Sequence, residues 1–303
     1  MSFSPNNFRN VVEDSQDTHD PEVRDPEVNE AHVPPRRIPN IGHAALFVSF
    51  AGLMLCLFEL LTYALGKFPV AIQGGATTVL HPRLQIATLA ATYFISLLAA
   101  WFVYPLLWQR TLLDGLSWNW SMARSQAVRL VALGAMLGTM MQFVTYFITP
   151  PKSPMPIDEF FATPVDAWLI TLFGTFAAPV FEEICFRGFL VPAFAIAYDW
   201  LSLPRTEEAR TRWQSTSNLS PDSLLFSAIL TSVLFAWMHA PQVSHLWAAL
   251  LGLFSISLVL TLIRVKTQSV AASAMVHAAY NGFVFLMALA ATGGYRHLDR
   301  MTH

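Results

Sequence analysis

Seven long apolar segments follow the first forty residues, and they constrain the fold more than any other feature of the sequence. A helix needs about 20 predominantly apolar residues to cross the roughly 30 Å hydrocarbon core of a bilayer. The first four segments reach or exceed this length, and the fifth is short. The segments are 44–65, 84–108, 127–148, 168–197, 224–238, 246–263 and 270–291. They predict an all-α fold, a multi-pass transmembrane bundle of about seven or eight helices around a buried polar site.

The fourth segment is too long for one straight crossing. It contains Pro179 and Pro192, and proline removes a helical hydrogen bond and clashes with the preceding turn. We therefore expect a kink, a tilt or a break in this segment, and an eighth helix could lie within it.

A scarcity of charge supports the membrane assignment. Charged residues make up 13% of the 303-residue chain and hydrophobic residues 54%, whereas ordinary soluble domains carry about 25% charged residues. The net charge of −2 gives no indication of a nucleic-acid partner. The two cysteines, Cys56 and Cys185, form neither a disulfide framework nor a Cys/His zinc pattern.

Composition divides the chain into four regions. Residues 1–40 hold eight of the 20 acidic side chains and several prolines, so we expect a disordered acidic tail. Residues 41–165 contain the N-terminal transmembrane helices, residues 166–292 form the core with the chemically informative residues, and residues 293–303 are a short C-terminal tail.

Lysine and arginine near the segment ends predict the orientation, because cytoplasmic loops carry the excess of these residues. With the N-terminus inside, ten lie on the cytoplasmic side and five on the other. The ten are Arg36, Arg37, Arg110, Arg124, Arg129, Arg205, Arg210, Arg212, Arg264 and Lys266, and the five are Lys67, Arg83, Lys152, Arg296 and Arg300. We expect a multi-pass protein of the cell membrane with a cytoplasmic N-terminus.

Several ionisable or amide side chains lie inside the apolar segments. An ionised side chain at the bilayer centre costs about 2.5–3.5 kcal/mol on insertion scales, so such groups should face the protein interior and find partners there. The fourth segment carries three, the fifth ends on one, and the seventh carries two. They are Glu182, Glu183, Arg187, His239, His277 and Asn281.

Helix geometry predicts how the charged groups pair. Glu183 and Arg187 are four residues apart, so they share a helix face and can form an ion pair. Glu182 is rotated from Glu183 by about 100° and needs a partner from another helix. His239 and His277 are the candidate partners by elimination.

This combination of groups is suited to hydrolysis. A carboxylate beside an imidazole can hold a water molecule and remove its proton. His277 and Asn281, four residues apart, could donate hydrogen bonds to the oxyanion of a tetrahedral intermediate. Alternatively, Glu182, His239 and His277 could be three ligands of Zn²⁺ that leave one position open for water. Either arrangement predicts a hydrolase for acyl bonds, most simply peptide bonds.

Three motifs occur in order along the apolar segments: Glu-Glu-x-x-x-Arg at 182–187, Phe-x-x-x-His at 235–239 and His-x-x-x-Asn at 277–281. Together they resemble the CPBP family, which comprises CAAX prenyl proteases and bacteriocin-processing enzymes and is also described as the type II CAAX endopeptidase or Abi family. A polar insert at about 203–221 departs from the family pattern.

The resemblance implies a role for each motif residue. Glu182 and His239 would activate water, His277 and Asn281 would form the oxyanion hole, and Glu183 with Arg187 would support the site. The family has been described both as metalloprotease and as glutamate protease, so a zinc cofactor stays open.

We therefore expect an intramembrane endopeptidase whose partners are membrane lipid and a peptide or protein substrate, prenylated or leader-bearing substrates among them. The alternatives are a membrane transporter and a non-catalytic scaffold or immunity protein that uses the same polar network structurally. Two further acids need a role: Glu59 stands alone in the first apolar segment, and Asp166 is expected to cap the start of the fourth.

Overall fold

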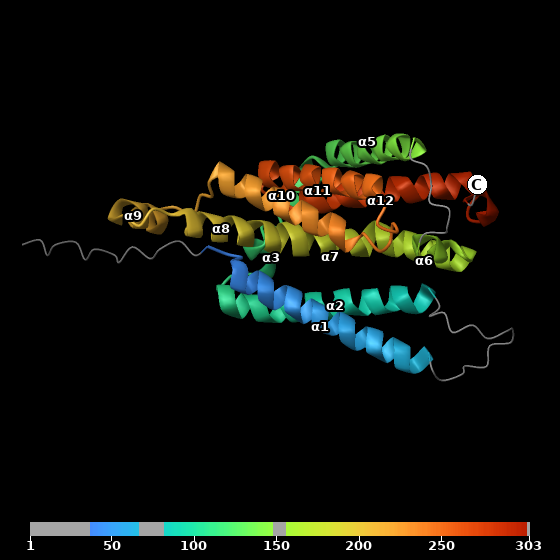
Figure 1. Ribbon diagram of the computed structural model, residues 1–303, viewed down its shortest axis with the longest axis horizontal. Coiled ribbons are helices and arrows are strands. Elements are labelled where there is room, and N and C mark those ends of the chain that lie inside the picture. The colour runs from blue at the N-terminus through green and yellow to red at the C-terminus, as the bar shows by residue number, and fades with distance from the viewer. Residues whose placement is uncertain (1–36, 67–81, 148–155, 302–303) are drawn as a thin grey trace, which may run out of the picture.

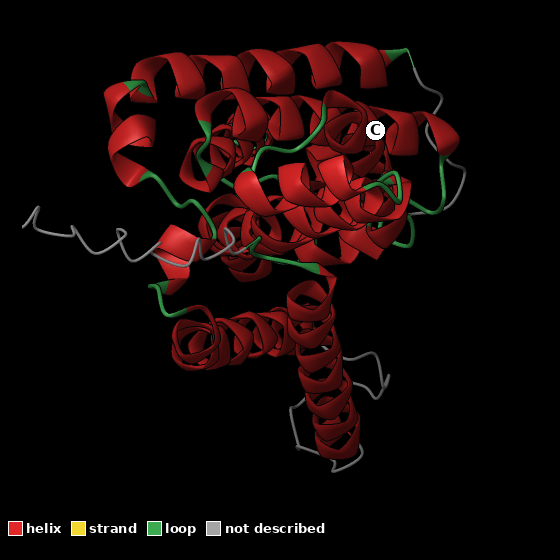
Figure 2. Ribbon diagram, turned by 90° about the vertical axis from the view of Figure 1, so that its left-hand side faces the viewer, coloured by secondary structure: helices red, strands yellow, loops and turns green. Residues whose placement is uncertain are grey.

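The computed structural model describes residues 37–66, 82–147 and 156–301. The predicted disordered tail lies outside these ranges up to residue 36, as do Lys67 and Lys152 of the orientation count. Figure 2 shows helices joined by loops and no strand in the described ranges. The predicted all-α fold is confirmed.

Within the described ranges, seven helical stretches are long and apolar enough to cross a membrane, and each coincides with one predicted apolar segment. They are α1 (Ile41–Gly66), α2 (Pro82–Trp108), α5 (Ala127–Tyr146), a continuous rod at Pro164–Ser202, α10 (Pro221–Met238), α11 (Trp247–Thr267) and α12 (Val270–Ala291). The shorter helices are α3 (Leu112–Gly115), α4 (Trp120–Ser125), η1 (Pro156–Phe161), α9 (Glu207–Ser215) and η4 (Leu298–Met301). The multi-pass helical bundle is thus confirmed.

The rod runs through the middle of the molecule. Figure 1 shows α1 and α2 on one side of it and α5, α10, α11 and α12 on the other. On α2, Thr88, Thr92, Ser96 and Ala100 are buried at four-residue intervals, and the Thr88 hydroxyl lies 2.7 Å from that of Thr62 on α1. Small side chains of this kind let two membrane helices approach closely.

The rod contains two π-helical stretches. It consists of α6 (Pro164–Leu172), the π-helix η2 (Phe173–Ala177), α7 (Ala178–Glu183), the π-helix η3 (Ile184–Leu190) and α8 (Val191–Ser202). Pro179 and Pro192 are the second residues of α7 and α8, so each follows a π turn. Because a wider turn relieves the clash of the proline ring with the preceding carbonyl, the expected interruption occurs without breaking the rod.

The rod begins with a capping threonine. Thr163 is the N-cap of α6, and its hydroxyl accepts a hydrogen bond from the backbone N–H of Asp166 and donates one to the Asp166 carboxylate. Asp166 is fully buried and also accepts from Arg83 Nε at 2.7 Å. The expectation that Asp166 is the cap is therefore corrected: Thr163 caps the helix, and Asp166 ties it to the start of α2.

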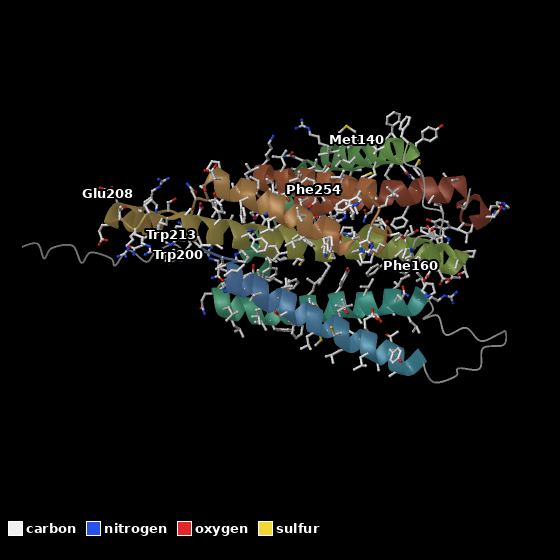
Figure 3. The ribbon with its side chains drawn as sticks, in the orientation of Figure 1. Met140, Phe160, Trp200, Glu208, Trp213 and Phe254 are labelled. Carbon is white, nitrogen blue, oxygen red and sulfur yellow. The ribbon has the colours of Figure 1, made fainter. Side chains whose placement is uncertain are left out.

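The polar insert forms α9, which continues the rod away from the bundle. Figure 3 shows Trp200, Glu208 and Trp213 at this end of the molecule. The guanidinium of Arg37 lies 3.5 Å from the centre of the Trp213 ring and donates a hydrogen bond to the Trp213 carbonyl oxygen at 3.1 Å. These contacts join the segment before α1 to the insert.

Candidate active site

The centre of the site is a buried ion pair within the rod. Arg187 Nη1 donates to Glu183 Oε1 at 2.8 Å, and both side chains are fully buried. Arg187 Nη2 also donates to the carbonyl oxygen and the hydroxyl of Ser257 on α11, at 2.8 and 2.7 Å. The pairing expected from the four-residue spacing is therefore present. The Ser257 contact was not predicted, because one serine in an apolar helix gives no indication of its partner.

His277 of α12 contacts both glutamates. Its Nδ1 lies 3.0 Å from Glu183 Oε1. Since an ionised carboxylate can only accept, Nδ1 carries the hydrogen and donates it. The other ring nitrogen, Nε2, lies 3.9 Å from Glu182 Oε2. The sequence assigned His277 to Glu182 alone, whereas its shorter contact is with Glu183.

His239, which follows the last residue of α10, presents the same nitrogen to the same oxygen. Its Nδ1 lies 2.8 Å from the Phe235 carbonyl oxygen, so Nδ1 must be the donor. Its Nε2 lies 3.9 Å from Glu182 Oε2. The structure therefore brings Glu182, His239 and His277 together, with both Nε2 atoms facing one carboxylate oxygen.

Phe235 holds the two imidazoles in place. Its ring centre lies 4.5 Å from that of His239 and 5.8 Å from that of His277. The Arg187 guanidinium lies over the same ring, 5.1 Å from its centre. Phe235 is 1% exposed, so the aromatic residue of the Phe-x-x-x-His motif packs against three groups of the site.

The groups that meet at Glu182 are all hydrogen-bond acceptors when the histidines are neutral. Acceptors cannot bond to one another, and 3.9 Å is too long for a direct hydrogen bond. Two atoms at this separation can both lie about 2.8 Å from one water oxygen. Glu182 is 8% exposed, so this geometry lets a largely buried carboxylate and an imidazole share one water molecule.

Asn281 lies at the first π turn. Its Nδ2 donates to the Gly174 carbonyl oxygen at 2.7 Å. In this turn the N–H of Ala178 bonds to the carbonyl five residues earlier, that of Phe173. The next such acceptor is Gly174, but Pro179 has no N–H to offer it. Asn281 supplies the missing donor and keeps its second amide hydrogen free of described partners.

The three candidate zinc ligands do not match a zinc geometry. Tetrahedral Zn²⁺ with bonds of about 2.0–2.1 Å places its ligand atoms about 3.3 Å apart, whereas Glu182 Oε2 lies 3.9 Å from each imidazole Nε2. In the described part of the chain, no group of three or more His, Cys, Asp or Glu side chains could hold a metal ion. The alternative with Glu182, His239 and His277 as zinc ligands is therefore not supported.

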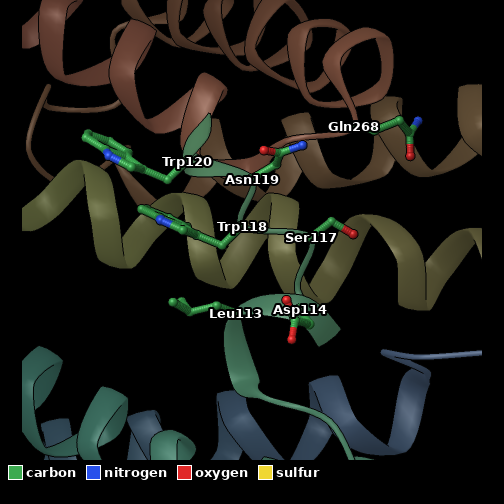
Figure 4. A pocket seen from close by; sticks show the side chains of 7 residues that line it. All are labelled: Leu113, Asp114, Ser117, Trp118, Asn119, Trp120 and Gln268. Atoms are coloured by element: carbon green, nitrogen blue, oxygen red, sulfur yellow. The ribbon is translucent and has the colours of Figure 1, made fainter. Parts of the chain in front are cut away.

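Two hollows elsewhere lack this chemistry. Figure 4 shows one of about 390 Å³ at the loop between α3 and α4, where Asp114 is the only titratable lining residue. The other, of about 940 Å³, lies beside α9 and includes Asp199. The Asp199 carboxylate accepts hydrogen bonds from Ser220 and Ser223. Neither hollow combines a carboxylate with an imidazole.

Residues 164–283 match the model of one protein family, described as type II CAAX prenyl endopeptidase Rce1-like. We call these residues the Rce1-like region, after the family whose model they match. The Rce1-like region begins with the rod and contains all three motifs, and α1, α2 and α5 lie before it. The family resemblance inferred from the motifs is confirmed, and the family is one of peptidases.

Neither the curated proteins nor the solved structures include a significant match to this chain. The Rce1-like region and the seven apolar helices together indicate a multi-pass membrane protein.

Proposed function

We propose that this protein is an intramembrane endopeptidase that hydrolyses peptide bonds with a water molecule activated by Glu182 and His239. One observation carries the proposal. A single carboxylate oxygen of Glu182 lies 3.9 Å from the Nε2 atoms of both His239 and His277, and a hydrogen bond through Nδ1 fixes each imidazole. The Rce1-like match supports the same activity.

The proposed reaction uses each group according to its position. The water donates hydrogen bonds to Glu182 and His239, and Glu182 removes a proton as the water oxygen attacks the scissile carbonyl carbon. When the tetrahedral intermediate collapses, the carbon–nitrogen bond breaks and protonated Glu182 gives its proton to the leaving amine. His277 donates through Nε2 to the developing oxyanion when that nitrogen carries a proton, and Asn281 offers its second amide hydrogen. Glu183 and Arg187 hold His277 in this orientation.

The substrates we propose are peptides or proteins at the membrane, prenylated or leader-bearing ones among them. The family description refers to CAAX prenyl endopeptidases, and the site lies among apolar helices that would contact lipid. We further propose that the protein is in the cell membrane with its N-terminus in the cytoplasm, on the basis of ten Lys and Arg residues against five.

The test compares purified wild-type protein with Glu182→Ala on a farnesylated CAAX peptide, with the products identified by mass spectrometry. We expect kcat to fall by about 10²–10⁴-fold, because the general base is lost. Glu59→Ala is the matched control, since Glu59 is an exposed glutamate of α1, and it should retain wild-type activity.

Wild-type cleavage by Glu182→Ala would contradict the mechanism, and would favour a structural use of the polar network. Elemental analysis of the same active preparation should find zinc well below one ion per chain, and stoichiometric zinc would overturn the metal-free form of the proposal.

A further inference from the structure

The proposed site is short of hydrogen-bond donors. A tetrahedral intermediate needs donors aimed at its oxyanion before the reaction begins. His239 and His277 each use Nδ1–H elsewhere, on Phe235 and Glu183, so a neutral imidazole has no hydrogen left for the substrate. Asn281 gives one of its two amide hydrogens to Gly174. A further donor near Glu182 would therefore change what the site can do.

Tyr93 of α2 packs against the rod at the turn that carries Glu182. Its ring lies flat on that of Phe181, with centres 3.8 Å apart and an angle of 4° between the planes. It also stacks with Phe173, at 5.5 Å and 26°. Phe181 directly precedes Glu182. Two stacked contacts thus fix the Tyr93 ring against the residue that directly precedes Glu182.

The Tyr93 hydroxyl has a hydrogen to offer. It makes no hydrogen bond within the described residues. It is also not one of their completely buried polar atoms that lack a partner. The titratable groups that act on it electrostatically are Glu182 and Cys185, which lie one helical turn apart on the rod. By contrast, Tyr104 on the same helix donates its hydroxyl hydrogen to the His43 carbonyl oxygen at 2.8 Å.

We propose that Tyr93 is a further catalytic residue, whose hydroxyl donates a hydrogen bond to the oxyanion of the tetrahedral intermediate. As the water oxygen bonds to the scissile carbon, the carbonyl π electrons move to the carbonyl oxygen and the water proton moves to Glu182. Tyr93 keeps its own proton and stabilises the new negative charge. This inference rests on the proposed peptidase function, and it assigns a catalytic group to a helix outside the Rce1-like region.

Tyr93→Phe tests the proposal, because it removes the hydroxyl and keeps the stacked ring. Loss of one oxyanion donor typically lowers kcat by about 10²–10³-fold. We expect kcat for the farnesylated peptide to fall by at least about tenfold, with KM changed by less than about twofold, since the interaction forms only in the transition state. A smaller fall in kcat, or a loss carried by KM alone, overturns the proposal.

Tyr104→Phe is the matched control. It removes a hydroxyl from the same helix at a site where that group donates to the His43 carbonyl oxygen, so it should lower Tm and leave kcat unchanged. If Tyr93→Phe does not fold, 3-fluorotyrosine at position 93 replaces it. Its more acidic hydroxyl is a stronger hydrogen-bond donor and should raise kcat, and an unchanged kcat overturns the proposal. If Tyr93→Phe is fully active while Glu182→Ala is inactive, the catalytic role of Tyr93 is contradicted and the proposed peptidase function is still supported.

Discussion

Glu183 is completely buried and accepts hydrogen bonds from two cationic or ionisable side chains. Arg187 reaches it along the same helix, and His277 reaches it from α12. Arg187 in turn donates to Ser257 on α11. A buried charge of this kind is stable only while its partners remain, because removing one partner leaves the other unpaired in a medium of low dielectric.

Arg187→Met should therefore destabilise the protein by about 3–5 kcal/mol, the usual cost of breaking a buried ion pair from one side. The free energy of unfolding, measured with denaturant in detergent micelles, checks this. Adding Glu183→Leu should recover a large part of the loss, since the unpaired carboxylate is then removed, but should not restore peptidase activity, because His277 loses its partner. A double variant as unstable as Arg187→Met would contradict this account.

Among these residues, sequence reasoning predicted the contacts within one helix better than those between helices. The pairing of Glu183 with Arg187 follows from four-residue spacing, which fixes the geometry locally. The contact between Glu183 and His277 joins residues 94 positions apart, and no helical period relates them. The convergence of His239 and His277 on Glu182 could be inferred only because few other titratable groups lie inside the membrane segments.

In the rod, too, the sequence predicted the features that depend on one helix alone and missed those that depend on a neighbouring helix. The length of the rod and its two prolines were visible in the sequence and predicted an irregularity. The sequence did not predict that the irregularity would be π-helical, because this form depends on a neighbouring helix that donates a hydrogen bond to the freed carbonyl. Asn281 does so for Gly174, and the motif that suggested an oxyanion donor gave no sign of this structural contact.

A double-mutant cycle tests the link between Asn281 and Pro179. Asn281→Ala leaves the Gly174 carbonyl without its donor and should cost about 1–3 kcal/mol of stability. In a Pro179→Ala background the cost should be smaller, since the new backbone N–H can bond to the same carbonyl. Unfolding free energies of the four proteins give the coupling. Equal costs in the two backgrounds would show that Asn281 does not compensate for the proline.

At the scale of the whole molecule, the rod lies between α1 and α2 on one side and α5, α10, α11 and α12 on the other. The motif-bearing helices α10 and α12 belong to the Rce1-like region, whereas α1 and α2 precede it. The polar insert at α9 extends from the same rod and is held to the segment before α1 by Arg37. Two helices outside the family match, α1 and α2, thus contact the rod, and the segment before α1 contacts the insert.

An odd number of crossings places the two ends of the described chain on opposite sides of the membrane. In a Cys56→Ser/Cys185→Ser background, we expect Ser215→Cys on α9 to react with an impermeant maleimide only after the cells are permeabilised. His297→Cys, beyond α12, should react in intact cells. Both positions are exposed in the structure. Labelling of both from one side would contradict seven crossings, and the reverse pattern would contradict a cytoplasmic N-terminus.

The position of His277 along α12 sets where on that helix the proposed mechanism would act. It lies seven residues after Val270, the first residue of that helix, which corresponds to about 10 Å at 1.5 Å per residue. In the proposed mechanism, the scissile bond would be cut about two helical turns from the end where α12 begins. Because an intact substrate helix shields its own carbonyl groups, a chain that uncoils or ends at that level would be the best substrate of the proposed mechanism.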